Sequence, residues 1–415
     1  MAARTIVVGV SGGIAAYKAC MLVRDLKEHG DDVRVVPTPN ALNFVGAATF
    51  EALSGHPVST TVFDAVDEVQ HVRVGQEADA VVIAPATADV IARLVAGRAD
   101  DLLTATVLVA TCPIIVAPAM HTEMWNNPAT QANVAVLRQR GVTVLEPAHG
   151  RLTGHDSGAG RMLEPGQIAA LSRAVLDGAD LTPDWQGKKV VVSAGGTQEN
   201  IDPVRFIGNR SSGRQGFALA DVAAHRGADV TIVAGDTDAL DVPAGATVVR
   251  VRSTREMEQA MNEAATDADI IIMAAAVADF RPEAEADSKL KKGSVHEEAL
   301  STIHLVENPD ILAGLVERRD RGDLKDGVRI VGFAAETGDE SSSGLDYGRA
   351  KLARKGCDYL MVNEVTGGRV FGEATNRGWL LGRDGTEVTI PDASKHVVAA
   401  AILAQLDEKL DENLF

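Results

Sequence analysis

The sequence predicts an α/β protein made of two consecutive domains. Two observations carry this prediction. Apolar, strand-like segments alternate with amphipathic helical patterns along the chain, as they do in parallel β/α folds. A strand followed by a glycine-rich loop and a helix, which normally opens a nucleotide-binding domain, occurs at residues 5–29 and again at residues 189–226. With 415 residues, the chain is long enough to give each domain its own core.

Composition and charge exclude several classes of protein. The net charge of −18 argues against a nucleic-acid partner and against an anionic membrane surface. No apolar run approaches the roughly 18 residues of a membrane span, and the N-terminus enters a strand without a secretory signal. Cys20, Cys112 and Cys357 are far apart and show no CxxC spacing, which excludes a disulfide framework and a thiolate zinc site. We therefore expect a cytoplasmic protein.

The first half reads as a regular β/α series. Strands are predicted at residues 5–10, 33–36, 80–84, 114–117 and 142–145, and helices at 14–29, 88–96, 102–110, 129–140 and 165–176. Its first loop has the order GxSGG instead of GxGxxG, and Pro37-Thr38 stands where an acidic residue would hold a ribose hydroxyl. This pattern speaks against NAD and suits the phosphate of a mononucleotide, although a plain tight turn would explain it as well.

Two strands of this half end in similar loops. Residues 80–84 lead into Pro85-Ala86-Thr87, and residues 114–117 lead into Pro118-Ala119-Met120-His121. Because the carboxyl ends of parallel strands meet at one edge of a sheet, we expect these loops to share a site.

Six segments of the first half carry a family resemblance. They are GVSGGIAAYK at 9–18, His71, APATAD at 84–89, AGRADDL at 96–102, PAMH at 118–121 and SGAGRM at 157–162. In this order they resemble the flavin-dependent cysteine decarboxylases, in particular phosphopantothenoylcysteine decarboxylase. The resemblance implies a flavodoxin-like, three-layer domain over residues 1–188 that binds FMN and forms trimers. In that family FMN oxidises the substrate thiol, CO2 leaves, and the reduced flavin returns the hydride.

The resemblance also implies site residues. His71 corresponds to the active-site histidine, although a lone histidine is more often a helix-start or surface residue. His121 stands where the family commonly has an asparagine for the substrate carboxylate. The flap segment 151–157 lacks the usual cysteine, so His155, Asp156 or a water is left to supply a proton. The implied FMN-binding residues, of which the hydroxyl-bearing ones also suit plain turns, are Ser11, Gly12, Gly13, Thr38, Pro85, Ala86, Thr87 and Asp101.

The second half begins after residues 177–188, whose Gly, Pro and charge indicate a linker. Strands are predicted at residues 190–193, 230–234, 270–274, 330–334 and 359–362, with helices at 213–226, 254–265, 347–355 and 393–410. Two further strands, at 379–381 and 388–390, read as a hairpin joined by Asp384-Gly385.

The motifs of this half resemble phosphopantothenate–cysteine ligase. They are SAGGTQENIDPVRFIGNRSSGRQG at 193–216, AAAVADFRP at 274–282, KLKK at 289–292, NPDIL at 308–312 and GFAAET at 332–337. The resemblance implies a Rossmann-like α/β ligase domain over residues 189–415 that activates a carboxylate with CTP as an acyl-cytidylate. Fused in this order, the halves resemble the bifunctional coenzyme A biosynthesis family. That family implies dimeric ligase units and trimeric decarboxylase units in a closed homo-oligomer of twelve chains.

The ligase resemblance assigns roles residue by residue. Asn209 would turn the acyl-cytidylate over to the amide, Lys289 would contact the phosphates, and Asp279 would hold Mg2+ or Mn2+. Ser211, Ser212 and Gly213, at a predicted helix start, suit a triphosphate. The remaining implied CTP-binding residues are Met273, Ala274, Ala275, Pro309, Asp310, Ile311, Leu312, Phe333, Lys351 and Lys355. Without the resemblance, KLKK reads as a solvated charge run and the Lys351/Lys355 pair as ordinary surface lysines.

The predicted substrates are therefore 4′-phosphopantothenate, L-cysteine, CTP and 4′-phosphopantothenoylcysteine, with FMN as cofactor. Two other hypotheses stay open on the residues alone. One is an NAD(P)-linked dehydrogenase with two Rossmann-like halves, and the other is a non-catalytic flavoprotein regulator.

Overall fold

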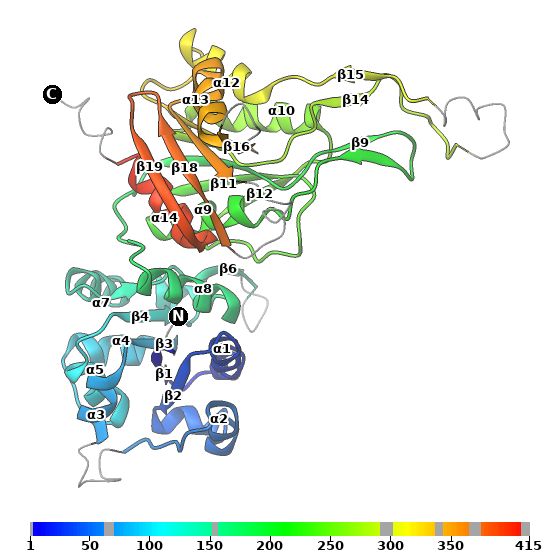
Figure 1. Ribbon diagram of the computed structural model, residues 1–415. Coiled ribbons are helices and arrows are strands. Elements are labelled where there is room, and N and C mark those ends of the chain that lie inside the picture. Colours follow the sequence, from blue (N-terminus) through cyan, green and yellow to red (C-terminus); the bar gives the residue numbers. More distant parts are fainter. Residues whose placement is uncertain are drawn as a thin grey trace. The chain divides into compact units, whose positions relative to one another are not determined.

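A computed structural model describes residues 3–61, 70–151, 157–290, 302–336, 343–364 and 375–407 (Figure 1). The chain divides into two compact units, Met1–Thr182 and Pro183–Phe415, and each contains its own wholly or mainly parallel sheet flanked by helices. The predicted α/β fold class is confirmed.

The division between the units falls slightly before the predicted boundary of 188/189, and Trp185 explains why. Its backbone N–H donates to the carbonyl of Arg226 at 2.7 Å, and its indole Nε1 donates to Asp407 at 2.6 Å. The Arg226 guanidinium lies 4.2 Å from the centroid of the buried indole ring, in a cation–π contact. The end of the polar linker is thus packed into the second unit.

The sheet of the first unit has the order β2-β1-β3-β4-β5, and all its pairings are parallel. Its strands are β1 Thr5–Val10, β2 Asp32–Pro37, β3 Ala80–Ala86, β4 Ile114–Pro118 and β5 Thr143–Val144. This is the flavodoxin-like order, in which the direction of winding reverses between β1 and β3. Ligands bind outside the carboxyl ends of the strands at such a point.

Helices cover both faces of this sheet and make three layers. Figure 1 shows α1 and α2 on one side of the strands and α3, α4 and α5 on the other. The first face is packed by the apolar stripe of α1, which includes Leu22, Val23 and Leu26. The elements are α1 Ala16–Glu28, η1 Pro39–Asn43, α2 Ala47–Ser54, α3 Gln70–Glu77, α4 Ala88–Val95, α5 Leu102–Val109, α6 Thr122–Trp125, α7 Pro128–Gln139 and α8 Pro165–Leu176. A separate antiparallel ribbon joins β6 Ala148–Arg151 to β7 Ser157–Arg161.

The sheet of the second unit has the order β12-β11-β8-β13-β16-β17-β18-β19. Its first six strands are parallel and follow the Rossmann order, with the reversal between β8 and β13. They are β12 Thr247–Arg250, β11 Asp229–Ala234, β8 Lys189–Ala194, β13 Ile270–Met273, β16 Arg329–Glu336 and β17 Tyr359–Glu364. The predicted hairpin is present as antiparallel β18 Thr375–Gly382 and β19 Glu387–Ser394.

Helices α9 Arg214–His225 and α14 Lys395–Ala404 lie on one side of this sheet, and α10 Thr254–Ala264, α12 Ile311–Asp320 and α13 Gly344–Lys355 lie on the other (Figure 1). A short 3-10 turn, η3 Ala265–Asp267, follows α10. Two antiparallel ribbons leave the sheet, one made of β9 Gln198–Asn200 and β10 Phe206–Gly208, the other of β14 Phe280–Pro282 and β15 Leu305–Glu307. Both ribbons follow strands that end at the point of reversal.

The last helix starts later than predicted. Ala393 still pairs with Asn376 in the sheet, and the Ser394 hydroxyl accepts the Val397 N–H, so Ser394 caps a helix that begins at Lys395. Within the described ranges, no helix has the length and apolar character needed to cross a bilayer.

Candidate active sites

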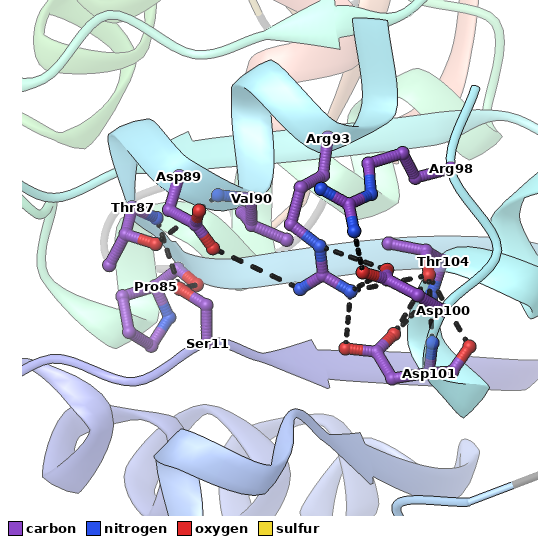
Figure 2. A network of polar contacts seen from close by, with 10 residues as sticks. All are labelled: Ser11, Pro85, Thr87, Asp89, Val90, Arg93, Arg98, Asp100, Asp101 and Thr104. Atoms are coloured by element: carbon purple, nitrogen blue, oxygen red, sulfur yellow. Dashed lines mark hydrogen bonds and ion pairs between the residues drawn. The ribbon is translucent and has the colours of Figure 1, made fainter. Parts of the chain in front are cut away.

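The loops after β1 and β3 are joined directly at the reversal point of the first unit. The Ser11 hydroxyl donates to the Pro85 carbonyl at 2.8 Å, and the Thr87 N–H donates back to Ser11 Oγ at 3.0 Å (Figure 2). Ser11 is buried. The structure therefore brings together residues that the sequence predicts to be FMN-binding and that are separated by over seventy positions.

Thr38 adds the loop after β2 to this group. Its N–H donates to the Val10 carbonyl at 2.8 Å. Its Oγ1 is buried and has no hydrogen-bond partner in the part of the chain that the structure describes. A β-carbon at Gly12 would lie 2.6 Å from the β-carbon of Asn40, so glycine is what allows the first and second loops to approach so closely. A buried hydroxyl without a partner among the described residues fits the phosphate of FMN.

Asp101 has a role within the fold itself. Its Oδ1 accepts the N–H and the hydroxyl of Thr104, both at 2.9 Å, and so caps α5. Its Oδ2 accepts from Arg93 at 2.7 Å, and Arg93 also pairs with Asp100 at 2.5 Å (Figure 2). Arg93 was not singled out by the sequence motifs, although it stands four residues after Asp89 on α4. This network fixes the AGRADDL turn beside the predicted flavin loops.

His71 is the second residue of α3, and its Nδ1 is buried without a hydrogen-bond partner among the described residues. A structural histidine normally has such a partner, so the described residues give this nitrogen no structural role. His121 occupies the N-cap position of α6, is exposed, and makes no capping bond with its side chain.

The PAMH loop is also held by β7. The Met120 N–H donates to the Gly160 carbonyl at 2.9 Å. Gly160 has φ +132°, and a β-carbon there would lie 2.4 Å from the Met120 carbonyl oxygen. This contact joins β7, which follows the predicted flap segment, to the PAMH loop beside His121. The two candidate proton donors, His155 and Asp156, lie outside the described residues.

The second unit contains a cavity of about 830 Å³ at its own reversal point. It lies at the carboxyl ends of β13 and β16, beside the first residues of α9, α12 and α14 and the last turns of α13. Every residue predicted for CTP except Lys289 lines it, together with Asn209: Ser211, Ser212, Gly213, Met273, Ala274, Ala275, Asp279, Pro309, Asp310, Ile311, Leu312, Phe333, Lys351 and Lys355.

The glycines that open this half are explained by close backbone approach. Gly195 has φ +79°, and a β-carbon there would lie 2.3 Å from the Asp236 carbonyl oxygen. A β-carbon at Gly196 would lie 2.5 Å from the carbonyl oxygen of Asn209. The turn therefore presses the Asn209 segment against the sheet, where the Asn209 side-chain amide donates to the Val277 carbonyl at 2.9 Å.

The charge of the cavity is opposite to that of the chain. Its cationic lining residues are Arg210, Arg214, Lys351, Arg354, Lys355 and Lys395, against the acids Asp279 and Asp310. Burial raises the pKa of Asp310, but the hydrogen bond from Lys355, the Ala313 N–H and the nearby positive charges outweigh burial, so its pKa is lowered. Asp310 is therefore held as an anion by Lys355. Such a lining suits a polyphosphate.

Asp279 is the other carboxylate of the cavity lining and is exposed. Among the described residues there is no cluster of three or more His, Cys, Asp or Glu side chains suited to a metal. Mg2+ usually needs only one or two protein carboxylates when substrate phosphates complete its coordination, so the single carboxylate fits that ion.

Lys289 is the exception to the predicted set. It is exposed and does not belong to the cavity lining, and the neighbouring lysines at 291 and 292 lie outside the described residues. Lining residues that the prediction did not name include Asn308, Arg354, Asn363, Asn376 and Lys395. Two of these carried a signal, because Asn308 opens the NPDIL motif and Arg354 stands one helical turn after Lys351. The other three come from the hairpin side of the sheet, where no motif pointed.

Comparisons with known proteins assign each half of the chain to a protein family. The Flavoprotein family matches residues 1–177, and the DNA/pantothenate metabolism flavoprotein C-terminal domain family matches residues 185–410. The protein named coenzyme A biosynthesis bifunctional protein CoaBC is 59% identical in Mycolicibacterium smegmatis, over 97% of both chains. The protein of that name in Vibrio parahaemolyticus is 42% identical, over 98% of this chain and 99% of its own.

Solved structures were also found. The C-terminal domain of a CoaBC protein is 33% identical, covers 56% of this chain and all of its own, and has a TM-score of 0.45. A PPC decarboxylase mutant complexed with pantothenoylaminoethenethiol is 31% identical, covers 42% of this chain and 99% of its own, and has a TM-score of 0.39.

The full-length matches favour neither a dehydrogenase nor a non-catalytic regulator. Two family models account for the two units in order, and curated relatives of the same name span nearly the whole chain. The chain belongs to the family of coenzyme A biosynthesis bifunctional proteins.

Proposed function

We propose that this chain ligates L-cysteine to 4′-phosphopantothenate with CTP and then decarboxylates the 4′-phosphopantothenoylcysteine to 4′-phosphopantetheine with FMN. The observation that carries the ligase half is the cationic cavity, which gathers hydroxyl, amide and lysine groups in a chain of net charge −18. The decarboxylase half is supported by the buried atoms of Thr38 and His71 that have no hydrogen-bond partner in the described ranges.

In the ligase cavity, the carboxylate of 4′-phosphopantothenate attacks the α-phosphorus of CTP, and pyrophosphate leaves. This step needs alignment and neutralisation of charge more than covalent participation by the protein. Ser211, Ser212 and the start of α9 offer hydroxyl and N–H donors to the phosphates, while Lys351 and Lys355 add positive charge. Asp279 would hold the Mg2+ that accompanies the triphosphate.

In the second ligase step, the cysteine amine attacks the acyl carbon and CMP leaves. Asn209 is on the cavity wall and its side-chain amide is a hydrogen-bond donor. We assign it to the acyl carbonyl, where a donor stabilises the charge that develops on oxygen. Lys289 is assigned to the phosphates through its position after the AVADFRP segment.

In the decarboxylase site, bound FMN supplies the acceptance and return of a hydride. The chain's own residues hold and orient the reactants: Ser11, Thr38 and Thr87 bind the flavin, and His121 donates to the substrate carboxylate. His71 orients or neutralises that carboxylate and accepts a proton. The flap proton is assigned to His155, Asp156 or a water.

We extend the proposal to assembly and location. Trimeric decarboxylase units and dimeric ligase units would combine into a dodecamer in the cytoplasm. Three free cysteines support a reducing compartment, and the acidic charge supports the absence of nucleic-acid and membrane partners.

The test is direct. The purified protein should be yellow, should form CMP from CTP only when phosphopantothenate, cysteine and Mg2+ are all present, and should then release CO2. A protein without CMP formation would refute the ligase assignment. A colourless protein that also gains no flavin absorbance on reconstitution with FMN would refute the decarboxylase assignment.

A further inference from the structure

Beneath the wall of the ligase cavity lies a buried polar network, formed by Thr197, Glu199, Thr254 and Asn308. Thr254 is fully buried, Thr197 likewise, and Glu199 is only 4% exposed. Thr197 and Glu199 come from the segment after β8, and Thr254 is the first residue of α10. Of the four residues, only Asn308 reaches the cavity surface.

The network holds the loop that carries Asp279. The Ala278 N–H donates to Thr197 Oγ1 at 2.9 Å, and the Ala278 carbonyl accepts from Asn308 Nδ2, also at 2.9 Å. The Asn308 N–H donates to the Asp279 carbonyl at 2.8 Å. Both sides of the peptide backbone next to Asp279 are thus bonded to the network.

Thr254 connects these bonds to the carboxylate. Its hydroxyl lies 2.7 Å from Glu199 Oε1, 3.1 Å from Thr197 Oγ1 and 3.2 Å from Asn308 Nδ2. An ionised carboxylate can only accept, so the Thr254 proton points at Glu199. Thr254 Oγ1 then accepts from Thr197 and Asn308, and Thr197 in turn is free to accept the Ala278 N–H.

The donors therefore run in one direction, from Ala278 through Thr197 and Thr254 to Glu199. A chain of this kind is strengthened by mutual polarisation, and a buried network whose members are satisfied has one stable arrangement. Glu199 also accepts the Thr254 N–H at 2.8 Å, which caps the start of α10.

We propose that Glu199, Thr197 and Thr254 are positioning residues for the metal-bearing loop, and that they set the place of Asp279 before CTP and Mg2+ bind. The inference rests on the proposed ligase function for the identity of the ligand. It goes beyond that function because it assigns the positioning of the Asp279 loop to residues that do not line the cavity. Partners behind a metal ligand commonly change metal affinity by about 10- to 100-fold when they are removed.

A pair of substitutions at Thr254 isolates the network. Thr254→Val has the same shape but no hydroxyl, and it keeps the backbone N–H that Glu199 caps. Thr254→Ser keeps the hydroxyl and is the conservative control. Thr266→Val removes an exposed hydroxyl, bonded to the Asn262 carbonyl at 3.3 Å, and controls for the same chemical change elsewhere.

The first readout needs neither CTP nor metal. Hydrogen–deuterium exchange by the full-length protein is followed in peptides that cover residues 274–280. We expect the Ala278 amide to exchange about tenfold faster in Thr254→Val, and at the original rate in Thr254→Ser and Thr266→Val, because only the first variant removes the hydroxyl that accepts from Thr197 and Asn308 and so releases the network that holds Ala278. Unchanged exchange in Thr254→Val would overturn the proposal.

The second readout is the affinity for CTP by calorimetry, with Mg2+ and with EDTA. We expect Thr254→Val to weaken CTP binding about tenfold in Mg2+ and much less in EDTA, and we expect Thr254→Ser to bind like the original chain. Equal losses in Mg2+ and EDTA, or an equal loss in Thr254→Ser, would mean that the network only supports the fold and would overturn the proposal.

If Thr254→Val does not fold, Glu199→Gln serves in its place, since the amide keeps an acceptor oxygen but loses the charge that orients the chain. It should change the same readouts in the same direction, and no change would count against the network. Failure of the proposed function is distinguishable, because a wild-type protein that forms no CMP would remove the ligase assignment while the exchange result would still stand.

Discussion

Replacement of Asn209 by alanine distinguishes two possible roles for this residue, support of its loop and donation to the acyl carbonyl, because the two predict losses of rate of different size. In the resting structure its side-chain amide donates to the Val277 carbonyl at 2.9 Å, across the rim of the cavity. If this loop contact is its whole contribution, the loss is that of an ordinary hydrogen bond, roughly 0.5–1.5 kcal/mol, or about 2- to 13-fold. A donor to the acyl carbonyl in the transition state is worth about 100- to 1,000-fold.

The two roles also affect different steps. Loss of loop support would slow acyl-cytidylate formation and its aminolysis alike. Loss of a carbonyl donor would leave pyrophosphate release within about tenfold of normal and slow aminolysis by at least about 100-fold. We therefore expect Asn209→Ala to accumulate acyl-cytidylate, and Asn209→Asp, which keeps the shape but lacks the N–H donor, to do the same.

Rapid acid quench with CTP labelled at the α-phosphorus measures both steps. The label should pass into acyl-cytidylate at nearly the normal rate and then stay there when cysteine is added. Undiminished amide formation by Asn209→Ala, or equal slowing of pyrophosphate release and amide formation, would refute the assignment of Asn209 to the acyl carbonyl.

Three further changes test the rest of the molecule. His71→Asn should stop CO2 release while flavin absorbance and CMP formation persist, and normal turnover would remove His71 from the mechanism. Gly160→Ala should abolish decarboxylation and spare CMP formation. The reason is that alanine would have to adopt φ +132°, with its β-carbon 2.4 Å from the Met120 carbonyl oxygen, which strains the backbone by roughly 1–3 kcal/mol or more. Gly166→Ala is its control, because the new methyl group meets nothing within 4 Å. Burial raises the pKa of Cys357 to about 11, so at pH 8 its thiolate fraction is about 1 in 1,000, against about a quarter for an ordinary thiol. Site-resolved labelling with Ellman's reagent should modify Cys357 only on unfolding, and rapid labelling of the native protein would contradict its burial.

The order of the elements could be read from the chain. Strands 5–10 and 190–193 were predicted by local apolar patterns, and the structure has them as β1 and β8. The same holds for the hairpin at Asp384-Gly385, because turn chemistry is local. The small departures were at the ends of elements. Ser394 caps α14, for example, so that this helix begins at Lys395, two residues later than periodicity indicated.

The candidate sites were predicted in part. The residues named from the ligase motifs, Lys289 apart, all line the cavity of the second unit and make up half of its lining, while the exposed Lys289 is not among the lining residues. Asn363, Asn376 and Lys395 were missed because strand order, which no local pattern specifies, brings the hairpin side of the sheet to the cavity.

By itself, the sequence determined that a strand, a glycine-rich loop and a helix open each of two domains. It also determined that each half alternates strands with helices, and which loops carry hydroxyls, lysines and glycines. Those properties depend on periodicity and on neighbours within a few residues. Only the tertiary structure decided that Thr254 meets Glu199 across 55 positions and that Trp185 belongs to the second unit. It also decided that Thr38 and His71 have polar atoms with no partner in the part of the chain that the structure describes. Burial and hydrogen-bond pairing arise when distant segments pack, and no local pattern of residues records which segments will meet.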